Sequence, residues 1–286
     1  MSTTFQRIAV VGSGLIGGSL IKSLRRRVPE CKLIGVDSRD ILAAAQEYLD
    51  EAYAPEKLAA AVRDADLIFL ATPSNTILQQ LPEVAQSIRR GAVVTDVGST
   101  KSLIVAEAQK HFMGERFFIG GHPLAGREKG GWENARADLF EHAAYVLTPQ
   151  SNFPAHLSEA LTQLLQTLGA RVIELEPEAH DRLVADISHL PQLLAVALMN
   201  FIARDNASPE LALQLAAGGF RDMTRLAASP FAIWQDIFAG NRANVRRSLQ
   251  EFIVALQNLA QAFDHDGLEP HFKQANQLRQ NLAARQ

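Results

Sequence analysis

The chain has 286 residues, of which 47% are hydrophobic and 21% are charged, and 28 Lys and Arg against 31 Asp and Glu give a formal charge of −3. This composition is typical of a soluble globular protein and excludes disordered and fibrous classes, and no basic arm marks a nucleic-acid-binding protein. The single cysteine, Cys31, excludes a disulfide framework within the chain. We find no secretory leader and no unbroken apolar run of about 18 residues, so we expect a cytoplasmic protein that binds neither nucleic acid nor membrane.

Short apolar runs alternate with helical patterns through the first 176 residues. The runs lie at 8–11, 33–36, 67–70, 92–95, 117–119, 144–147 and 171–174, and the helical patterns at 15–27, 39–49, 56–63 and 154–168. Apolar runs without alternation indicate strands that are buried on both faces of a parallel sheet. We therefore predict an α/β fold, with a Rossmann-like, doubly wound, mostly parallel sheet over residues 1–176.

After Pro177 the β-branched runs stop, which predicts a separate, all-helical domain over residues 177–286. Its helices are expected at 178–204, 207–217, 219–227, 230–239, 241–265 and 268–283. Along 241–265, apolar residues spaced by three and four form one stripe, made of Val245, Leu249, Phe252, Ile253, Leu256, Leu259 and Phe263. The stripe supports two interpretations: a homodimer formed through this domain, or burial against neighbouring helices of the same chain.

A glycine-rich loop follows the first run. Gly12, Gly14 and Gly17 form the pattern G-x-G-x-x-G between a predicted strand and a predicted helix, where the helix N-terminus would face a pyrophosphate. Asp37 follows 20 residues after Gly17, at the end of the next run, where a carboxylate can bind ribose hydroxyls. The residues expected to bind a dinucleotide are Gly12, Gly14, Leu15, Ile16, Gly17 and Asp37, with Thr72 and Pro73 after the third run.

The same region bears on the choice of dinucleotide. The carboxylate of Asp37 would repel the 2′-phosphate of NADP, which favours NAD. Arg39, two residues on, could instead pair with that phosphate, so NADP stays possible. No metal ion is expected.

His122 lies in IGGHPLAGREKGG, between a glycine pair and a proline at the end of an apolar run. Ligands bind at the carboxyl ends of strands in open α/β sheets, so we predict that His122 is the acid/base residue of a dehydrogenase. Ser99, in DVGSTK after the preceding strand, could hydrogen-bond a substrate hydroxyl or orient His122. The alternative is that Ser99 caps the helix that starts near Lys101.

Motifs in a fixed order carry a family resemblance. VVGSGLIGGSL, TDVGSTK, GGHPLAGREKGG, ISHLP and GGFRDMTR occur in that order between residues 7 and 240. Together they resemble the prephenate/arogenate dehydrogenase family of tyrosine biosynthesis. The resemblance implies that His122 takes the proton from the ring C4 hydroxyl while hydride leaves C4 for the nicotinamide, and that Ser99 hydrogen-bonds near that hydroxyl.

The resemblance also implies substrate-binding residues: His189 and Arg225, with Arg225 pairing with a carboxylate, Gly219 of the same motif as Arg225, and Glu128 on the loop after the histidine. From the residues alone, His189 could be a core histidine that hydrogen-bonds backbone groups left unpaired by Pro191. Arg225 could be a surface residue that pairs with Asp222. His180 and Asp181 could be only a capping pair at the start of the helical domain.

The chain departs from the family pattern at Arg127, where many relatives have a small or hydroxyl residue, and at Gln192, where many have a second histidine. These differences bear on substrate preference more than on reaction type. We expect an NAD-dependent prephenate dehydrogenase, with an arogenate or dual-specificity cyclohexadienyl dehydrogenase as the first alternative. A hydroxyacid dehydrogenase of the 6-phosphogluconate type is disfavoured because only Lys273 follows Pro177 to serve as its usual lysine. A non-catalytic NAD-binding sensor would not need His122, Ser99 and Arg225 together.

Overall fold

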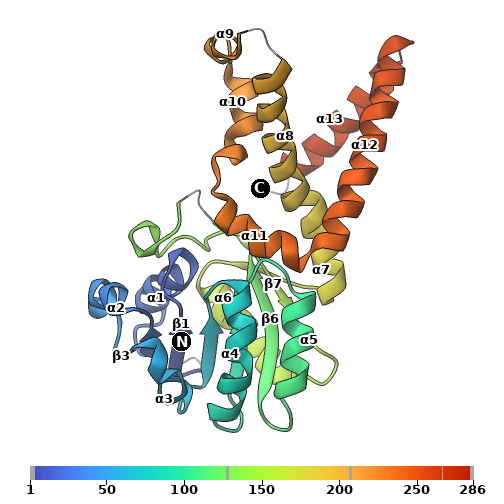
Figure 1. Ribbon diagram of the computed structural model, residues 1–286. Helices are drawn as coiled ribbons and strands as arrows, with labels where there is room; N and C mark the ends of the chain where they lie inside the picture. The colour runs from blue at the N-terminus through green and yellow to red at the C-terminus, as the bar shows by residue number, and fades with distance from the viewer. Residues whose placement is uncertain (1–3, 127–128, 206–207, 266, 284–286) are drawn as a thin grey trace.

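A computed structural model of the chain describes residues 4–126, 129–205, 208–265 and 267–283. It shows a sheet-containing domain, with a group of helices standing on one end of it (Figure 1). The strands are β1 (Arg7–Val11), β2 (Lys32–Val36), β3 (Glu51–Tyr53), β4 (Leu67–Leu70), β5 (Val93–Asp96), β6 (Phe117–Pro123), β7 (Ala144–Thr148) and β8 (Arg171–Glu174). They form one sheet of order β3-β2-β1-β4-β5-β6-β7-β8. The predicted Rossmann-like, mostly parallel sheet is confirmed.

The sheet departs from the sequence prediction at its two edges. β3 was not predicted, because its three residues, with an exposed alanine in the middle, make no apolar run. β7 pairs antiparallel with β6, whereas the pairs from β3 through β6, and β7 with β8, are parallel. Within the described part of residues 124–143 the chain forms only the 3₁₀ turn η3 (Trp132–Asn134), so no crossover helix carries it back to start a parallel strand.

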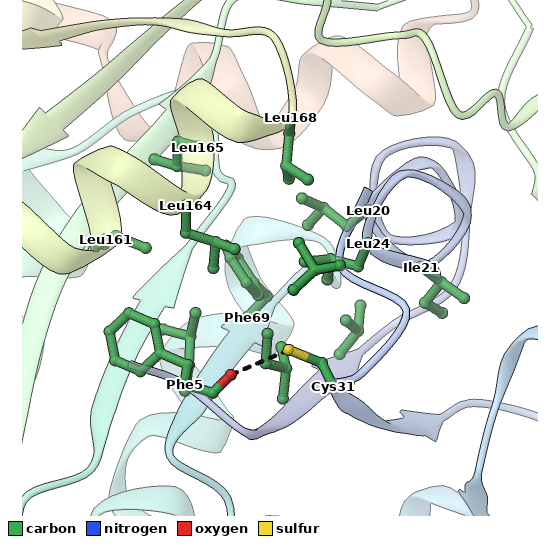
Figure 2. Close-up of a cluster of buried hydrophobic side chains, with 14 of the residues drawn as sticks. Phe5, Leu20, Ile21, Leu24, Cys31, Phe69, Leu161, Leu164, Leu165 and Leu168 are labelled. Carbon is green, nitrogen blue, oxygen red and sulfur yellow. Dashed lines mark hydrogen bonds between the residues drawn. The ribbon is translucent and has the colours of Figure 1, made fainter. Parts of the chain in front are cut away.

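Helices cover both faces of the sheet. They are α1 (Leu15–Arg27), α2 (Arg39–Ala45), α3 (Leu58–Val62), α4 (Ser74–Ser87), α5 (Ser102–His111) and α6 (Ala155–Thr167), with 3₁₀ turns η1 (Gln46–Tyr48) and η2 (Pro55–Lys57). Leucines of α1 and α6 meet Phe69 of β4 on one face (Figure 2). On the other face, α3, α4 and α5 cover alternate strand residues such as Ala9 and Val11. Burial on both faces explains why a central strand such as β4 is apolar throughout.

The helical part begins at Pro177, where proline's fixed φ suits the first turn of a helix. It contains α7 (Pro177–Val184), the π turn η4 (Ala185–His189), α8 (Leu190–Asp205), α9 (Pro209–Gln214), α10 (Gly218–Thr224), the 3₁₀ turn η5 (Arg225–Ala228), α11 (Phe231–Gly240), α12 (Arg242–Asp264) and α13 (Glu269–Ala283). α11 lies across the end of the sheet domain, and α8 and α12 rise away from it (Figure 1).

The predicted helix 178–204 is interrupted by the π turn. Pro191 lacks an N–H, and its ring would clash with a carbonyl one turn earlier in a regular α-helix, so the wider turn just before it accommodates the proline. Taken as a whole, Pro177–Arg204 is long and apolar enough to cross a membrane, with mean hydropathy 1.3 over its most apolar window, of which 33% is buried. Core helices of soluble proteins meet the same criterion.

Candidate functional site

The glycine loop has the shape that a pyrophosphate needs. Gly12 has φ +91°, and a Cβ there would lie 2.7 Å from the backbone of Ala71. A Cβ on Gly17 would overlap the carbonyl oxygen of Gly12, so both glycines are required for close packing of β1, β4 and α1. A Cβ on Gly14 meets nothing within 4 Å. The missing side chain of Gly14 therefore leaves open space at the N-terminus of α1, where a phosphate would bind.

Asp37 closes the loop from the neighbouring strand. Its Oδ2 accepts a hydrogen bond of 2.6 Å from the Ser13 backbone N–H, and its Oδ1 accepts one of 2.7 Å from the Ser38 N–H. The carboxylate is half-buried, whereas Arg39 is exposed. Among the described residues, the buried Ser13 hydroxyl has no hydrogen-bond partner. The open space at Gly14, this hydroxyl and the carboxylate fit a dinucleotide.

The other predicted cofactor residues surround the same loop. Leu15 and Ile16 open α1 and are half-buried. Thr72 lies against Gly12, and its hydroxyl donates a hydrogen bond of 2.9 Å to Gln80 of α4. Pro73 is exposed just before α4. These residues thus meet where β1 and β4, neighbours in the sheet, both end.

His122 and Ser99 lie on one cavity between the two domains. The cavity has a volume of about 310 Å³ and is lined by Ser99, His122, Pro123, Leu124, Ala125, Gly126, Ser188, His189, Trp234 and Ile237. Ser99 comes from the loop after β5, and His122 from the carboxyl end of β6. Trp234 and Ile237 belong to α11. α5 begins at Ser102, with Lys101 as the residue before its first turn, so Ser99 lies outside the capping position.

A buried ion pair fixes this end of the sheet. The Lys101 ammonium lies within the core, where it pairs with the Asp96 carboxylate and donates a hydrogen bond of 2.7 Å to the Gly121 carbonyl. The same carboxylate accepts from the backbone N–H groups of Gly98 at 2.8 Å and Gly121 at 3.1 Å. The Asp96–Lys101 pair therefore sets the position of the Ser99 loop relative to His122.

Burial controls the protonation of His122. Only 8% of the residue is exposed. Burial, followed by the electrostatic effects of His180, Lys101 and His189, lowers the pKa of His122 well below its ordinary value of 6.5. His122 is consequently a neutral imidazole near pH 7, which is the state in which it can accept a proton.

His189 closes the cavity from the helical side. It ends the π turn, is 1% exposed, and packs edge-on against Trp234 and Phe238. Burial lowers its pKa to about 4, against the opposing effect of Asp181. Its Nδ1 lies 3.3 Å from Asn241 Nδ2. His189 thus contributes both to the core of the helical domain and to the cavity wall.

Two of the predicted substrate residues that the structure describes, Arg225 and Gly219, do not line this cavity. Arg225 begins η5 and Gly219 lies in the first turn of α10, and both are exposed. Gln192 is buried beside η5, where its side-chain nitrogen donates a hydrogen bond of 3.0 Å to the carbonyl of Leu226. Arg127 and Glu128 lie outside the described residues.

Sequence reasoning missed two residues behind His122. His180 Nε2 lies 2.8 Å from His122 Nδ1, and His180 Nδ1 lies 2.9 Å from Asp181 Oδ1. The sequence suggested that they could be only a capping pair, but His180 contacts the predicted acid/base residue and Asp181 contacts His180. The adjacent histidine and carboxylate at the start of a domain were the available signal, but nothing in the sequence spacing places them beside β6.

Two family models match the chain. "Prephenate dehydrogenase, nucleotide-binding domain" matches residues 20–174, and "Prephenate dehydrogenase, dimerization domain" matches residues 176–280. The chain is 35% identical to the prephenate dehydrogenase of Bacillus subtilis, over 98% of this chain and 76% of that protein.

Solved structures agree with this match. Prephenate dehydrogenase from Aquifex aeolicus, in complex with hydroxyphenyl propionate and NAD⁺, superposes with a TM-score of 0.88 at 29% identity, over 99% of each chain. Synechocystis arogenate dehydrogenase superposes with a TM-score of 0.84 at 34% identity, over 96% of this chain and 99% of that one.

Proposed function

The chain belongs to the prephenate dehydrogenase family, and from this membership we propose that it is a cytoplasmic enzyme of tyrosine biosynthesis. The reaction is the oxidation of prephenate by NAD to 4-hydroxyphenylpyruvate, carbon dioxide and NADH. One observation carries the proposal: a buried, neutral His122 shares a cavity with Ser99 between the dinucleotide-type loop and the helical domain.

The proposed chemistry needs one base at the cavity wall. His122 accepts the proton of the C4 hydroxyl, and Ser99 hydrogen-bonds that hydroxyl and keeps it facing the imidazole. NAD, when bound, accepts the hydride from C4. Loss of the ring carboxylate as carbon dioxide then makes the ring aromatic, which drives the reaction forward. A well-placed general base contributes about 10²- to 10⁴-fold in rate.

The helical domain is proposed to hold the substrate. Prephenate is a dianion, and the guanidinium of Arg225 suits a carboxylate because its planar fork donates two parallel hydrogen bonds. His189 and Gly219 are the other proposed contacts, together with Glu128, which follows His122 in the sequence. For the cofactor, NAD is favoured over NADP because the Asp37 carboxylate lies at the end of β2, where a 2′-phosphate would be repelled.

Arogenate is the second candidate substrate. It differs from prephenate in carrying an amino group in place of the side-chain keto group. The similarity to Synechocystis arogenate dehydrogenase, at 34% identity over nearly the whole chain, favours testing it equally.

We also propose a homodimer formed through the helical domain. The C-terminal family model is described as a dimerization domain. On α12 the apolar stripe is exposed over its second half, with Ile253 46% and Phe263 71% exposed. A second copy would cover this surface.

The deciding assay mixes the purified protein with prephenate or arogenate, each with NAD or NADP, and follows the absorbance of the reduced nicotinamide. We expect the highest kcat/KM with prephenate and NAD. Preference for arogenate would replace the substrate within the same reaction, whereas absence of turnover in all four mixtures would refute the proposal.

A further inference from the structure

His122 stands at the end of a hydrogen-bonded chain of buried side chains. The His122 and His180 rings meet edge to face, with centroids 5.0 Å apart and planes at 80°. His122 Nδ1 lies 2.8 Å from His180 Nε2, and His180 Nδ1 lies 2.9 Å from Asp181 Oδ1. His180 and Asp181 are each 1% exposed, so water does not compete for these contacts.

The carboxylate at the far end is firmly held and charged. Asp181 Oδ1 accepts a hydrogen bond of 2.7 Å from the Lys101 backbone N–H, and Oδ2 accepts one of 2.9 Å from the Ser102 N–H. Asp181 thereby binds the N-terminus of α5, where the helix dipole favours a negative charge. Burial opposes this charge, but the hydrogen bonds from His180, Ser102 and Lys101 outweigh burial and lower the pKa of Asp181.

Asn241 fixes the backbone of the same residue. Its Nδ2 donates a hydrogen bond of 2.6 Å to the Asp181 carbonyl oxygen. Asn241 is itself buried, immediately before α12. Asp181 is thus held by α5 of the sheet domain on its side chain and by the α11–α12 junction on its backbone.

An ionised carboxylate only accepts hydrogen bonds, and this fact sets the direction of the whole chain. His180 must carry its proton on Nδ1 in order to donate to Asp181. In a neutral His180 imidazole, Nε2 then holds a lone pair and accepts from His122 Nδ1–H. The remaining nitrogen of His122, Nε2, is left without a proton.

We propose that His180 and Asp181 are positioning residues that hold His122 in the Nδ1–H tautomer, so that its Nε2 lone pair is available as the base. This inference rests on the proposed function. When the substrate proton moves from the C4 oxygen to His122 Nε2, the imidazole becomes an imidazolium. Its Nδ1–H bond to His180 then becomes charge-assisted, and Asp181 stabilises the new positive charge through His180 while staying ionised.

The tautomer can be measured without any substrate. In ¹⁵N-histidine-labelled protein at pH 7.5, two-bond ¹H–¹⁵N correlation spectra distinguish Nδ1–H from Nε2–H imidazoles, and the spectra of His122→Asn and His180→Asn assign the signals. We expect His122 as the Nδ1–H tautomer in the wild-type chain and a shift toward Nε2–H in Asp181→Asn. An Nε2–H His122 in the wild-type chain would overturn the inference, even if the enzyme turns over prephenate.

Kinetics test the consequence. Asp181→Asn keeps the size of the side chain, and we expect it to lower kcat about 10²- to 10⁴-fold while KM changes less than about threefold. This substitution also weakens the contact with α5 and so could destabilise the fold. A second pair of variants therefore distinguishes a loss of His122 positioning from a loss of folding stability. The Gln amide in His180→Gln can accept from His122 Nδ1–H, whereas the side chain in His180→Leu cannot.

We expect His180→Gln to keep kcat roughly tenfold above His180→Leu, the effect of about one hydrogen bond. Equal kcat values in these two variants, at similar melting temperatures, would contradict the positioning role. If the wild-type protein oxidises neither prephenate nor arogenate, the proposed function fails. The tautomer measurement still tests whether His180 and Asp181 hold His122 in the Nδ1–H form.

Discussion

At the scale of single residues, burial makes His122 a base. Because the buried site disfavours the imidazolium, the folded-state pKa of His122 lies well below 6.5. The base is therefore neutral, and active, at every pH above that lowered pKa. Activity is lost only as the pH falls through it, so the acid limb of kcat/KM should lie below pH 6.5.

Substituting His122 should remove that limb together with most of the rate. We expect His122→Asn to lower kcat about 10²- to 10⁴-fold with little change in KM, since the asparagine fills similar space but is not a base near neutral pH. Steady-state assays from pH 5 to pH 9 check both points. A His122→Asn variant that loses affinity but keeps kcat would show that His122 binds substrate instead.

Gly14 and Gly17 of the cofactor loop allow a matched pair of alanine substitutions. Gly17→Ala places a Cβ onto the Gly12 carbonyl and should destabilise the fold, whereas Gly14→Ala enters open space at an ordinary φ of −67°. We expect Gly14→Ala to melt like the wild-type chain but to raise the KM for NAD at least tenfold, because its methyl group occupies the approach of the pyrophosphate. An unchanged KM for NAD in this variant would place the phosphates elsewhere.

At the scale of elements, the Asp96–Lys101 pair joins the end of β5 to the loop that leads into α5. Both side chains are fully buried, so removing one leaves an uncompensated charge in the core. We expect Lys101→Met to cost about 3–5 kcal/mol of unfolding free energy in urea titrations. Lys110→Met is the control, because Lys110 is 66% exposed in its pair with Glu107 and should cost less than about 1 kcal/mol. Similar losses for the two variants would contradict a structural role for the buried pair.

The sequence predicted the positions of helices and strands better than it predicted the contacts between them. Apolar runs and the glycine loop are local signals, and β1, β4, β5 and α1 lie within a residue or two of their predicted bounds. Three-residue β3 and the reversed β7 depend on pairing partners, which no local pattern encodes. His180 reaches His122, and Asp181 reaches the N-terminus of α5, only because α7 packs beside α5, a contact between segments that are about 80 residues apart.

At the scale of the whole molecule, the apolar stripe of α12 is buried at one end and exposed at the other. Its first residue, Val245, is buried against the chain's own helices, with 7% exposure, whereas Leu256 and Phe263 are 49% and 71% exposed. Burial within the chain therefore holds at the base of α12. At its far end the apolar surface has no cover among the described residues of this chain, which is the surface expected of a dimer.

Substitutions on the exposed part of α12 test the proposed dimer. If a second copy covers α12, then Leu256→Asp combined with Phe263→Asp should convert a dimer into a monomer, because two carboxylates would be buried without partners. Light scattering after size-exclusion chromatography measures the mass directly. Met113→Asp is the control: Met113 is 70% exposed, in the loop after α5, and its substitution should leave the dimer intact.

Dimerisation should also appear in the melting temperature. Since association favours the folded state by mass action, the melting temperature of the wild-type chain should rise with protein concentration, and that of the double variant should not. A wild-type chain of monomer mass, with a melting temperature independent of concentration, would leave α12 exposed in solution and contradict the proposed dimer.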